Sequence, residues 1–203
     1  MQILFPNPFG WTLLSAEKIT ALQQQYGFSD TYAEFLRTQN GFRVDNLWDN
    51  PQRNLYLTGE WLDSEHCIDL RLLFGIVPTQ PHFDLEDYLT MPSLFAGLWF
   101  PLGISYGGDE FAEILHGKNQ GYIASFDHGL LAHYQTLEEV AAAMGIQDNE
   151  SLDKAALCDR LCAPELGFAW LHAPSFAALL QQYYRIDEHG RGFLTNEPST
   201  TVE

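Results

Sequence analysis

The residues from Gly103 to Gly107 read Gly-Ile-Ser-Tyr-Gly and match the G-x-S-x-G pattern around the nucleophile of α/β-hydrolases. That chemistry needs a strand before the serine, a helix after it, and then an acid and a histidine later in the chain. Four later residues have the required order: Asp127 or Asp159, followed by His172 or His189. Pro101 interrupts the strand that the motif requires, and Gly107-Gly108 starts a helix badly. A serine hydrolase that uses Ser105 is therefore the alternative hypothesis.

Two cysteines, Cys158 and Cys162, have a spacing found in zinc sites, and His66 adjoins Cys67. Structural zinc usually needs a second matching pair, and the sequence offers none. On a helix, Cys158 and Cys162 pack as small apolar residues. We therefore expect no metal and no cofactor. An odd number of cysteines without framework spacing indicates a reducing compartment.

Three carboxylates, Asp109, Glu110 and Glu113, lie close together in the sequence, with His116 nearby. Such a group can hold a cation or supply an acid and a base. A solvated strand edge or an acidic contact surface explains it equally simply, and we favour the contact surface. His128 directly follows Asp127, a pairing more typical of a turn or a cap than of catalysis.

The chain is strongly acidic, with 27 Asp and Glu residues against 10 Lys and Arg and a formal net charge of -17. Twelve of the acidic residues lie between positions 45 and 113, where only Arg53 and Arg71 oppose them. Such a field repels nucleic acid and anionic membranes and attracts basic partners. Trp48 lies in a polar stretch and is the best candidate for an exposed aromatic anchor. The predicted protein-binding residues are Asp45, Trp48, Asp49, Glu60, Asp63, Glu65, Asp84, Glu86, Asp87, Asp109, Glu110 and Glu113.

The N-terminal part predicts two short amphipathic helices. Ser15 can cap a helix that runs to Gln25 and ends at Gly27. Ser29 can cap a second helix that stops at Asn40-Gly41. The first ten residues lack the basic region and the apolar core of a signal peptide, so we expect a cytoplasmic protein.

The middle of the chain predicts strands. Residues 55–61 and 71–77 are strand candidates, and residues 111–128 read as a hairpin around the polar turn at 117–121. Residues 88–108 carry no charge, but prolines and glycines interrupt them. A buried, irregular segment therefore fits this stretch better than a membrane-spanning helix.

The C-terminal third predicts helices. Thr136 caps one helix, Ser151 or Asp153 opens another, and Pro174-Ser175 precede the last one. The sum is an α+β fold with a mostly antiparallel sheet flanked by helices, two helices at the start, strands in the middle and a helical C-terminal third. We expect a single domain over residues 1–186, with 136–170 as a helical insertion or 136–145 as its closing helix. Residues 187–203 then form a flexible tail.

Four segments in this order resemble the SUKH superfamily, which includes bacterial immunity proteins and fungal cell-wall-assembly regulators. The segments are YGFSDTYAEFLRTQNGF (26–42), FPLGISYGGDEF (100–111), GYIASFDHG (121–129) and SFAALLQQY (175–183). The resemblance implies a protein-binding scaffold without catalytic residues. It further implies an immunity protein that binds a toxin, such as a basic nuclease, and blocks it by occlusion. A regulatory scaffold without a toxin partner stays open, as does the oligomeric state.

Overall fold

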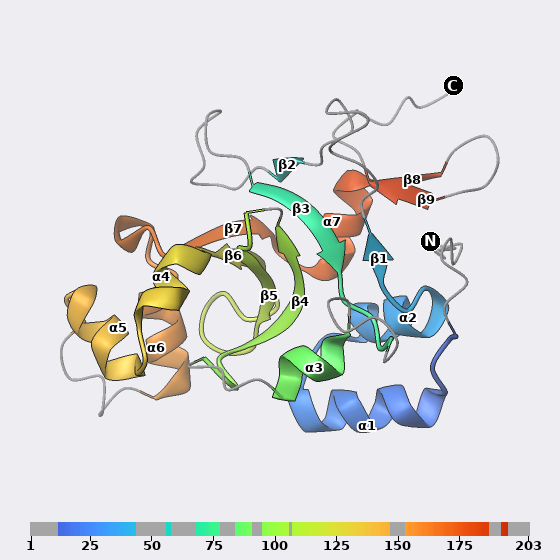
Figure 1. Cartoon of the computed structure of the whole chain (residues 1–203), viewed down its shortest axis with the longest axis horizontal. Coiled ribbons are helices and arrows are strands. Elements are labelled where there is room, and N and C mark those ends of the chain that lie inside the picture. The colour runs from blue at the N-terminus through green and yellow to red at the C-terminus, as the bar shows by residue number, and fades with distance from the viewer. Residues whose placement is uncertain are drawn as a thin grey trace.

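The computed structural model describes residues 12–43, 56–57, 68–77, 84–90, 95–105, 107–146, 153–186 and 192–194. The α+β architecture is confirmed, with helices at both ends of the chain and strands in the middle (Figure 1). No helix in these ranges has both the length and the apolar character needed to cross a bilayer.

An antiparallel sheet forms the centre of the molecule. Its strands are β1 (Phe42–Arg43), β3 (Ile68–Leu73), β4 (Trp99–Ser105), β5 (Glu110–Ile114), β6 (Ile123–Phe126) and β7 (Ala169–Ala173), hydrogen-bonded in that order. A further short strand, β2 (Tyr56–Leu57), also pairs with β3. Consecutive strands β3 to β6 are neighbours in the sheet, whereas β7 pairs with β6 only after a long, mostly helical segment of the chain.

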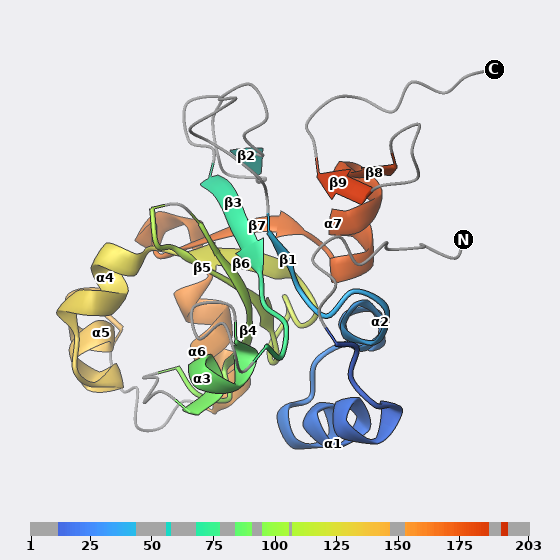
Figure 2. The same ribbon diagram turned by 45° about the vertical axis from the view of Figure 1, so that its right-hand side comes forward.

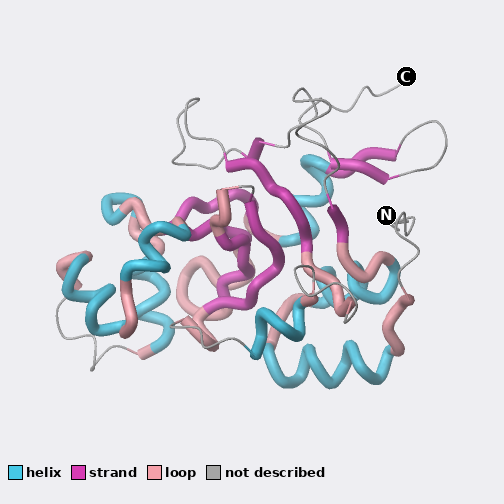
Figure 3. The backbone as a smooth tube through the Cα atoms, viewed as in Figure 1, coloured by secondary structure: helices cyan, strands magenta, loops and turns pink. Residues whose placement is uncertain are grey.

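Helices lie on both sides of this sheet (Figures 1 and 2). The first group is α1 (Ala16–Tyr26), α2 (Asp30–Thr38) and α7 (Phe176–Tyr183), and the second is α4 (His128–His133), α5 (Leu137–Ala143) and α6 (Lys154–Leu161). The short α3 (Leu85–Thr90) follows β3, and the 3-10 turn η4 (Pro164–Leu166) precedes β7. Figure 3 shows the strands gathered between the two groups of helices.

Each face of the sheet has its own apolar core, because side chains alternate along a strand. Phe100 and Leu102 of β4 pack in the core that contains residues of α1, α2 and α7. Their neighbour Trp99 belongs to the other core, with residues of α5 and α6. The sheet is therefore buried on both faces, and a polar side chain on its central strands must find a partner inside the protein.

The two N-terminal helices begin and end where the sequence predicts. The Ser15 side chain accepts a hydrogen bond from the Lys18 N–H at 3.2 Å, and α1 ends at Gly27 with φ +78°. The Ser29 side chain caps α2 through the Tyr32 N–H at 3.4 Å. After α2, the buried Asn40 takes φ +52°. Its Nδ2 donates to the Ile76 carbonyl oxygen, and its Oδ1 accepts from the Ile76 N–H.

Within residues 88–108, which the sequence predicts to be buried and irregular, Trp99–Ser105 form the strand β4. β4 pairs with β3 on one side and with β5 on the other, and its register shifts between Pro101 and Gly103. A Cβ atom at Gly103 would lie only 2.0 Å from the Leu72 carbonyl oxygen. Proline and glycine normally argue against a strand. Here the register shift accommodates Pro101, and the close approach of β3 requires a glycine at position 103.

The predicted hairpin is confirmed, since β5 and β6 pair antiparallel around the turn at 117–121. The strand predicted at 71–77 begins three residues earlier and ends at Leu73. Of the strand predicted at 55–61, only Tyr56–Leu57 lie among the described residues.

In the C-terminal third, Thr136 caps α5 and Asp153 caps α6, as predicted. The helical prediction for this region is wrong in one place, because Ala169–Ala173 form β7 at the edge of the sheet. The tail prediction also needs a correction. Gly192–Leu194 form β9, which pairs with β8 (Tyr184–Ile186), while the remainder of 187–203 lies outside the described residues.

Candidate functional site

The turn that joins β4 to β5 contains a connected group of polar residues. Ser105 is the last residue of β4 and is buried, with 1% of its surface exposed. Its N–H donates to the Asp109 carbonyl oxygen at 2.8 Å, and the Asp109 N–H donates back to the Ser105 Oγ at 2.9 Å. The Ser105 hydroxyl donates to the Asp109 Oδ2 at 3.1 Å. Ser105 and Asp109 therefore hold the turn closed.

Asp109 also connects this turn to the start of α4. Its Oδ1 accepts a hydrogen bond from the His128 N–H at 3.1 Å and lies 2.9 Å from the His128 Nδ1. Asp127 lies beside them, so that ligand atoms of Asp109, Asp127 and His128 all lie within 4.8 Å of one another. The Gly-Gly-Asp and Phe-Asp-His segments, which are distant in the sequence, thus meet at one end of the sheet.

This arrangement differs from a nucleophile elbow in two ways. The element after Ser105 is the strand β5, not a helix, so the serine is not raised on a strand-to-helix turn. In a catalytic triad the imidazole lies between the serine and the carboxylate. Here the carboxylate of Asp109 lies between Ser105 and His128, so within the described residues no imidazole contacts the serine hydroxyl as a base.

Of the later hydrolase candidates, Asp127 lies beside Asp109 and His128, whereas His172 and Asp159 are placed elsewhere. The His172 Nε2 lies 2.7 Å from the Ser125 Oγ in the interior of the protein, and the Asp159 Oδ1 accepts from the Lys118 N–H at 2.7 Å. His189 lies outside the described residues. The geometric conditions for Ser105 as a nucleophile are therefore absent from the described part of the chain.

The sequence pointed to Asp109, Glu110 and Glu113 as residues that could hold a cation, whereas the folded chain groups Asp109 with Asp127 and His128 as a candidate ligand set. Its Asp109 already uses both carboxylate oxygens in hydrogen bonds. The cysteine pair that the sequence also pointed to is buried, with Cys158 in α6 and Cys162 directly after its end. Burial raises the pKa of the Cys158 thiol to about 11 and that of Cys162 to about 12, which disfavours the thiolate that zinc requires. His66 and Cys67 lie outside the described residues.

Half of the predicted protein-binding residues also lie outside the described ranges: Asp45, Trp48, Asp49, Glu60, Asp63 and Glu65. The other six are described and have different environments.

For Asp84 and Glu113, the prediction of a place on an exposed surface is wrong, because each exposes only 4% of its surface. The Asp84 Oδ1 accepts from the N–H groups of Val77 and Glu86 at 3.3 and 3.2 Å, which fixes the start of α3. The Glu113 Oε2 accepts from the Ser29 N–H at 3.2 Å and so supports the start of α2. Burial raises the pKa of both carboxyl groups.

Glu110 is half-buried, and its Oε1 accepts a hydrogen bond from the Trp99 Nε1–H at 3.0 Å. Burial raises the pKa of this carboxyl to about 7. His116, which is near these carboxylates in the sequence, has its Nε2 2.9 Å from the Gly97 carbonyl oxygen.

Glu86 and Asp87 on α3 remain as partly exposed carboxylates. Glu86 forms an ion pair with Lys18 of α1. Asp87 forms no ion pair within the described part of the chain. Of the six described candidates, Glu86 and Asp87 best fit the acidic contact surface that the sequence predicts.

Comparison with family models, with curated proteins and with solved structures finds no match for this chain.

Proposed function

We propose that this protein is a non-catalytic binding module that recognises a basic protein through its acidic surface. The observation that carries the proposal is the imbalance of charge from Asp84 to Ile146. Nine Asp and Glu residues occur in that stretch, against Lys118 as the single Lys or Arg. Asp84 and Glu113 are buried, and the other seven are at least partly exposed. A surface with so few internal counter-charges produces a negative potential that attracts cations over a distance of about 10 Å at moderate salt.

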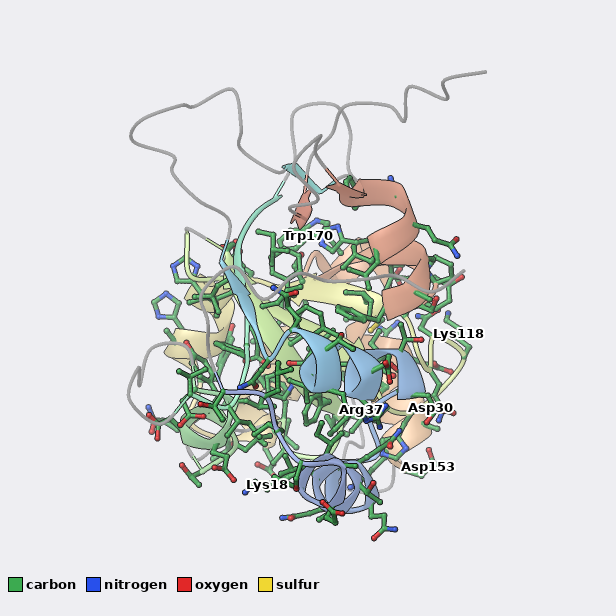
Figure 4. All side chains as sticks on the ribbon, turned by 90° about the vertical axis from the view of Figure 1, so that its right-hand side faces the viewer. Lys18, Asp30, Arg37, Lys118, Asp153 and Trp170 are labelled. Carbon is green, nitrogen blue, oxygen red and sulfur yellow. The ribbon has the colours of Figure 1, made fainter. Side chains whose placement is uncertain are left out.

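The few cations on α1 and α2 do not offset this potential. Figure 4 looks onto these two helices and labels Lys18 on the first and Arg37 on the second. Lys18 pairs with Glu86, and Arg37 pairs with Glu34. Asp87 and Glu138 have no ion pair among the described residues and are available to a partner.

The SUKH resemblance supports a more specific partner, a toxin that the protein neutralises by covering its active surface. Nucleases must approach phosphate groups and therefore carry basic surfaces. A chain with a net charge of -17 would be steered onto such a surface and would exclude the nucleic acid from it. Inhibition by occlusion requires complementary shape and charge but no reactive side chain in the inhibitor.

Affinity capture with the full-length protein tests this proposal. The tagged protein is incubated with extract of its native host at low salt, and bound proteins are eluted with a salt gradient and identified. We expect a partner with a surplus of Lys and Arg whose toxic activity stops at an equimolar ratio. A basic partner without toxicity would favour the regulatory scaffold, whereas a neutral or acidic partner that salt does not elute would contradict the proposal.

A further inference from the structure

A small cavity opens between the end of α1, α3 and the paired strands β4 and β5. Its volume is about 150 Å³. Tyr26, Tyr88, Leu89 and Phe100 supply much of its wall, which is predominantly apolar. Glu110 also lines it. The cavity therefore combines an apolar wall with an ionisable carboxyl group, the composition expected of a site for a small ligand.

The position of the Glu110 carboxyl is fixed by the indole beside it. The Trp99 ring lies between two other aromatic rings, with its centroid 4.3 Å from that of Phe95 and 3.9 Å from that of Phe126. Because both faces of the indole are covered, its edge is held in place, and its Nε1–H donates to the Glu110 Oε1 at 3.0 Å. The carboxyl group is thus oriented before any ligand arrives.

The Glu110 carboxyl accepts no other hydrogen bond and forms no ion pair within the described part of the chain. Lys154 is a cation at the cavity wall, since its Nζ would lie 2.8 Å from a Cβ atom on Gly97. Burial and the Trp99 hydrogen bond are the causes that shift the pKa of Glu110, and Lys154 is not among them. The second carboxylate oxygen therefore lacks a counter-charge from the described chain, which is costly for a desolvated anion.

We propose that this cavity binds a primary alkylammonium group, with the methylenes against Tyr26, Tyr88 and Leu89 and the ammonium on Glu110. A cavity of about 150 Å³ accommodates a ligand of benzene size. The four-carbon stem and ammonium of a lysine side chain have nearly that size. Tyrosine rings at the wall add a cation–π attraction. The ammonium supplies both the charge and the hydrogen-bond donor that the Glu110 carboxylate lacks.

Titration followed by NMR tests this proposal, with the indole N–H signal of Trp99 as the reporter beside Glu110. At about pH 8 the Glu110 carboxyl is ionised and an alkylammonium keeps its proton. We expect n-butylammonium to shift this signal saturably, and n-butanol, the neutral analogue, to bind at least about tenfold more weakly. Glu110→Gln keeps the shape and an acceptor for Trp99, and we expect it to weaken n-butylammonium binding at least about tenfold. Glu138→Gln removes an equal charge from the exposed α5 and should leave binding unchanged.

A second probe distinguishes the two possible sources of the ammonium. If lysine with both its α-amino and carboxyl groups blocked binds as well as n-butylammonium, the cavity accepts the side chain of a protein. If only n-butylammonium binds, the site takes a free amine, and the proposal also stands. Equal binding of n-butanol, an unchanged affinity in Glu110→Gln, or no saturable shift would overturn it. None of these results bears on the acidic-surface proposal, because that proposal concerns exposed charges and a protein partner.

Discussion

Glu110 and Glu113 are the same residue type on the same strand, yet they face opposite sides of the sheet and have different roles. Glu113 points toward α2 and binds the Ser29 N–H, so it supports a helix start. Glu110 points toward Trp99 and lines the cavity. An odd separation along a strand puts two side chains on opposite faces. The local sequence shows this separation but not what covers each face.

The raised pKa of Glu110 predicts a specific dependence of stability on pH. The unfolded carboxyl loses its proton near 4.5, whereas the folded one keeps it until about 7. Between these values the folded state binds more protons, so the free energy of unfolding falls as the pH rises, by at most about 3 kcal/mol from this group. Glu110→Gln should match the wild type near pH 5 and be more stable near pH 8, as measured by urea denaturation.

Glu138→Gln provides the control, because it removes an exposed carboxylate of α5 and should leave the pH profile of the wild type unchanged. Glu113 and Asp84 have raised pKa values as well and contribute to the wild-type slope. Their contribution is common to all three proteins. If the Glu110→Gln profile ran parallel to that of the wild type, the account of Glu110 would be wrong.

Ser105 should not react as a hydrolase nucleophile, because its hydroxyl donates to the Asp109 carboxylate and no imidazole contacts it in the described structure. We expect a fluorophosphonate probe to label the wild type and Ser105→Ala equally weakly. Labelling of the wild type that disappears in Ser105→Ala would restore the hydrolase alternative and contradict the turn geometry.

At the scale of elements, the contact between β3 and β4 depends on the missing side chain at Gly103. A methyl group there would lie 2.0 Å from the Leu72 carbonyl oxygen, so the strands would have to separate. We expect Gly103→Ala to lower the free energy of unfolding by at least about 2 kcal/mol. The matched control is Gly107→Ala, whose Cβ would meet its nearest atom, the Ser105 Oγ, at 3.5 Å. Equal stability of the two variants would contradict the close approach of β3.

The helices were predictable from the sequence because their signals are local. Ser15, Ser29, Thr136 and Asp153 each cap the helix that follows, and the capping bond spans only three residues. β4 was not predictable, because Pro101 and Gly103 argue against a strand unless the register shift and the neighbouring β3 are known. β7 is short, and its place is set by pairing with β6 rather than by its own pattern.

The candidate site was less predictable than the fold, because it depends on contacts between distant residues. The sequence contained Asp109, Asp127 and His128, but only the folded chain brings them together. It also contained Asp84 and Glu113, and an acidic residue is usually exposed. Both are buried, and backbone N–H groups satisfy their carboxylates. For Glu113 the donor is Ser29, which is distant in the sequence.

At the scale of the whole molecule, net charge determines how the protein meets a partner. A charge of -17 on a chain of 203 residues acts over several ångströms before contact, and dissolved salt screens it. The rate of association therefore responds to salt more strongly than the rate of dissociation, which short-range contacts control.

The most direct test of the proposed function is the association rate constant of this protein with the captured partner, measured by stopped-flow fluorescence as NaCl rises from about 20 to about 300 mM. We expect a fall of at least about tenfold, while the dissociation rate constant changes by less than about threefold. An association rate that stays constant across this range would contradict recognition of a basic protein through an acidic surface.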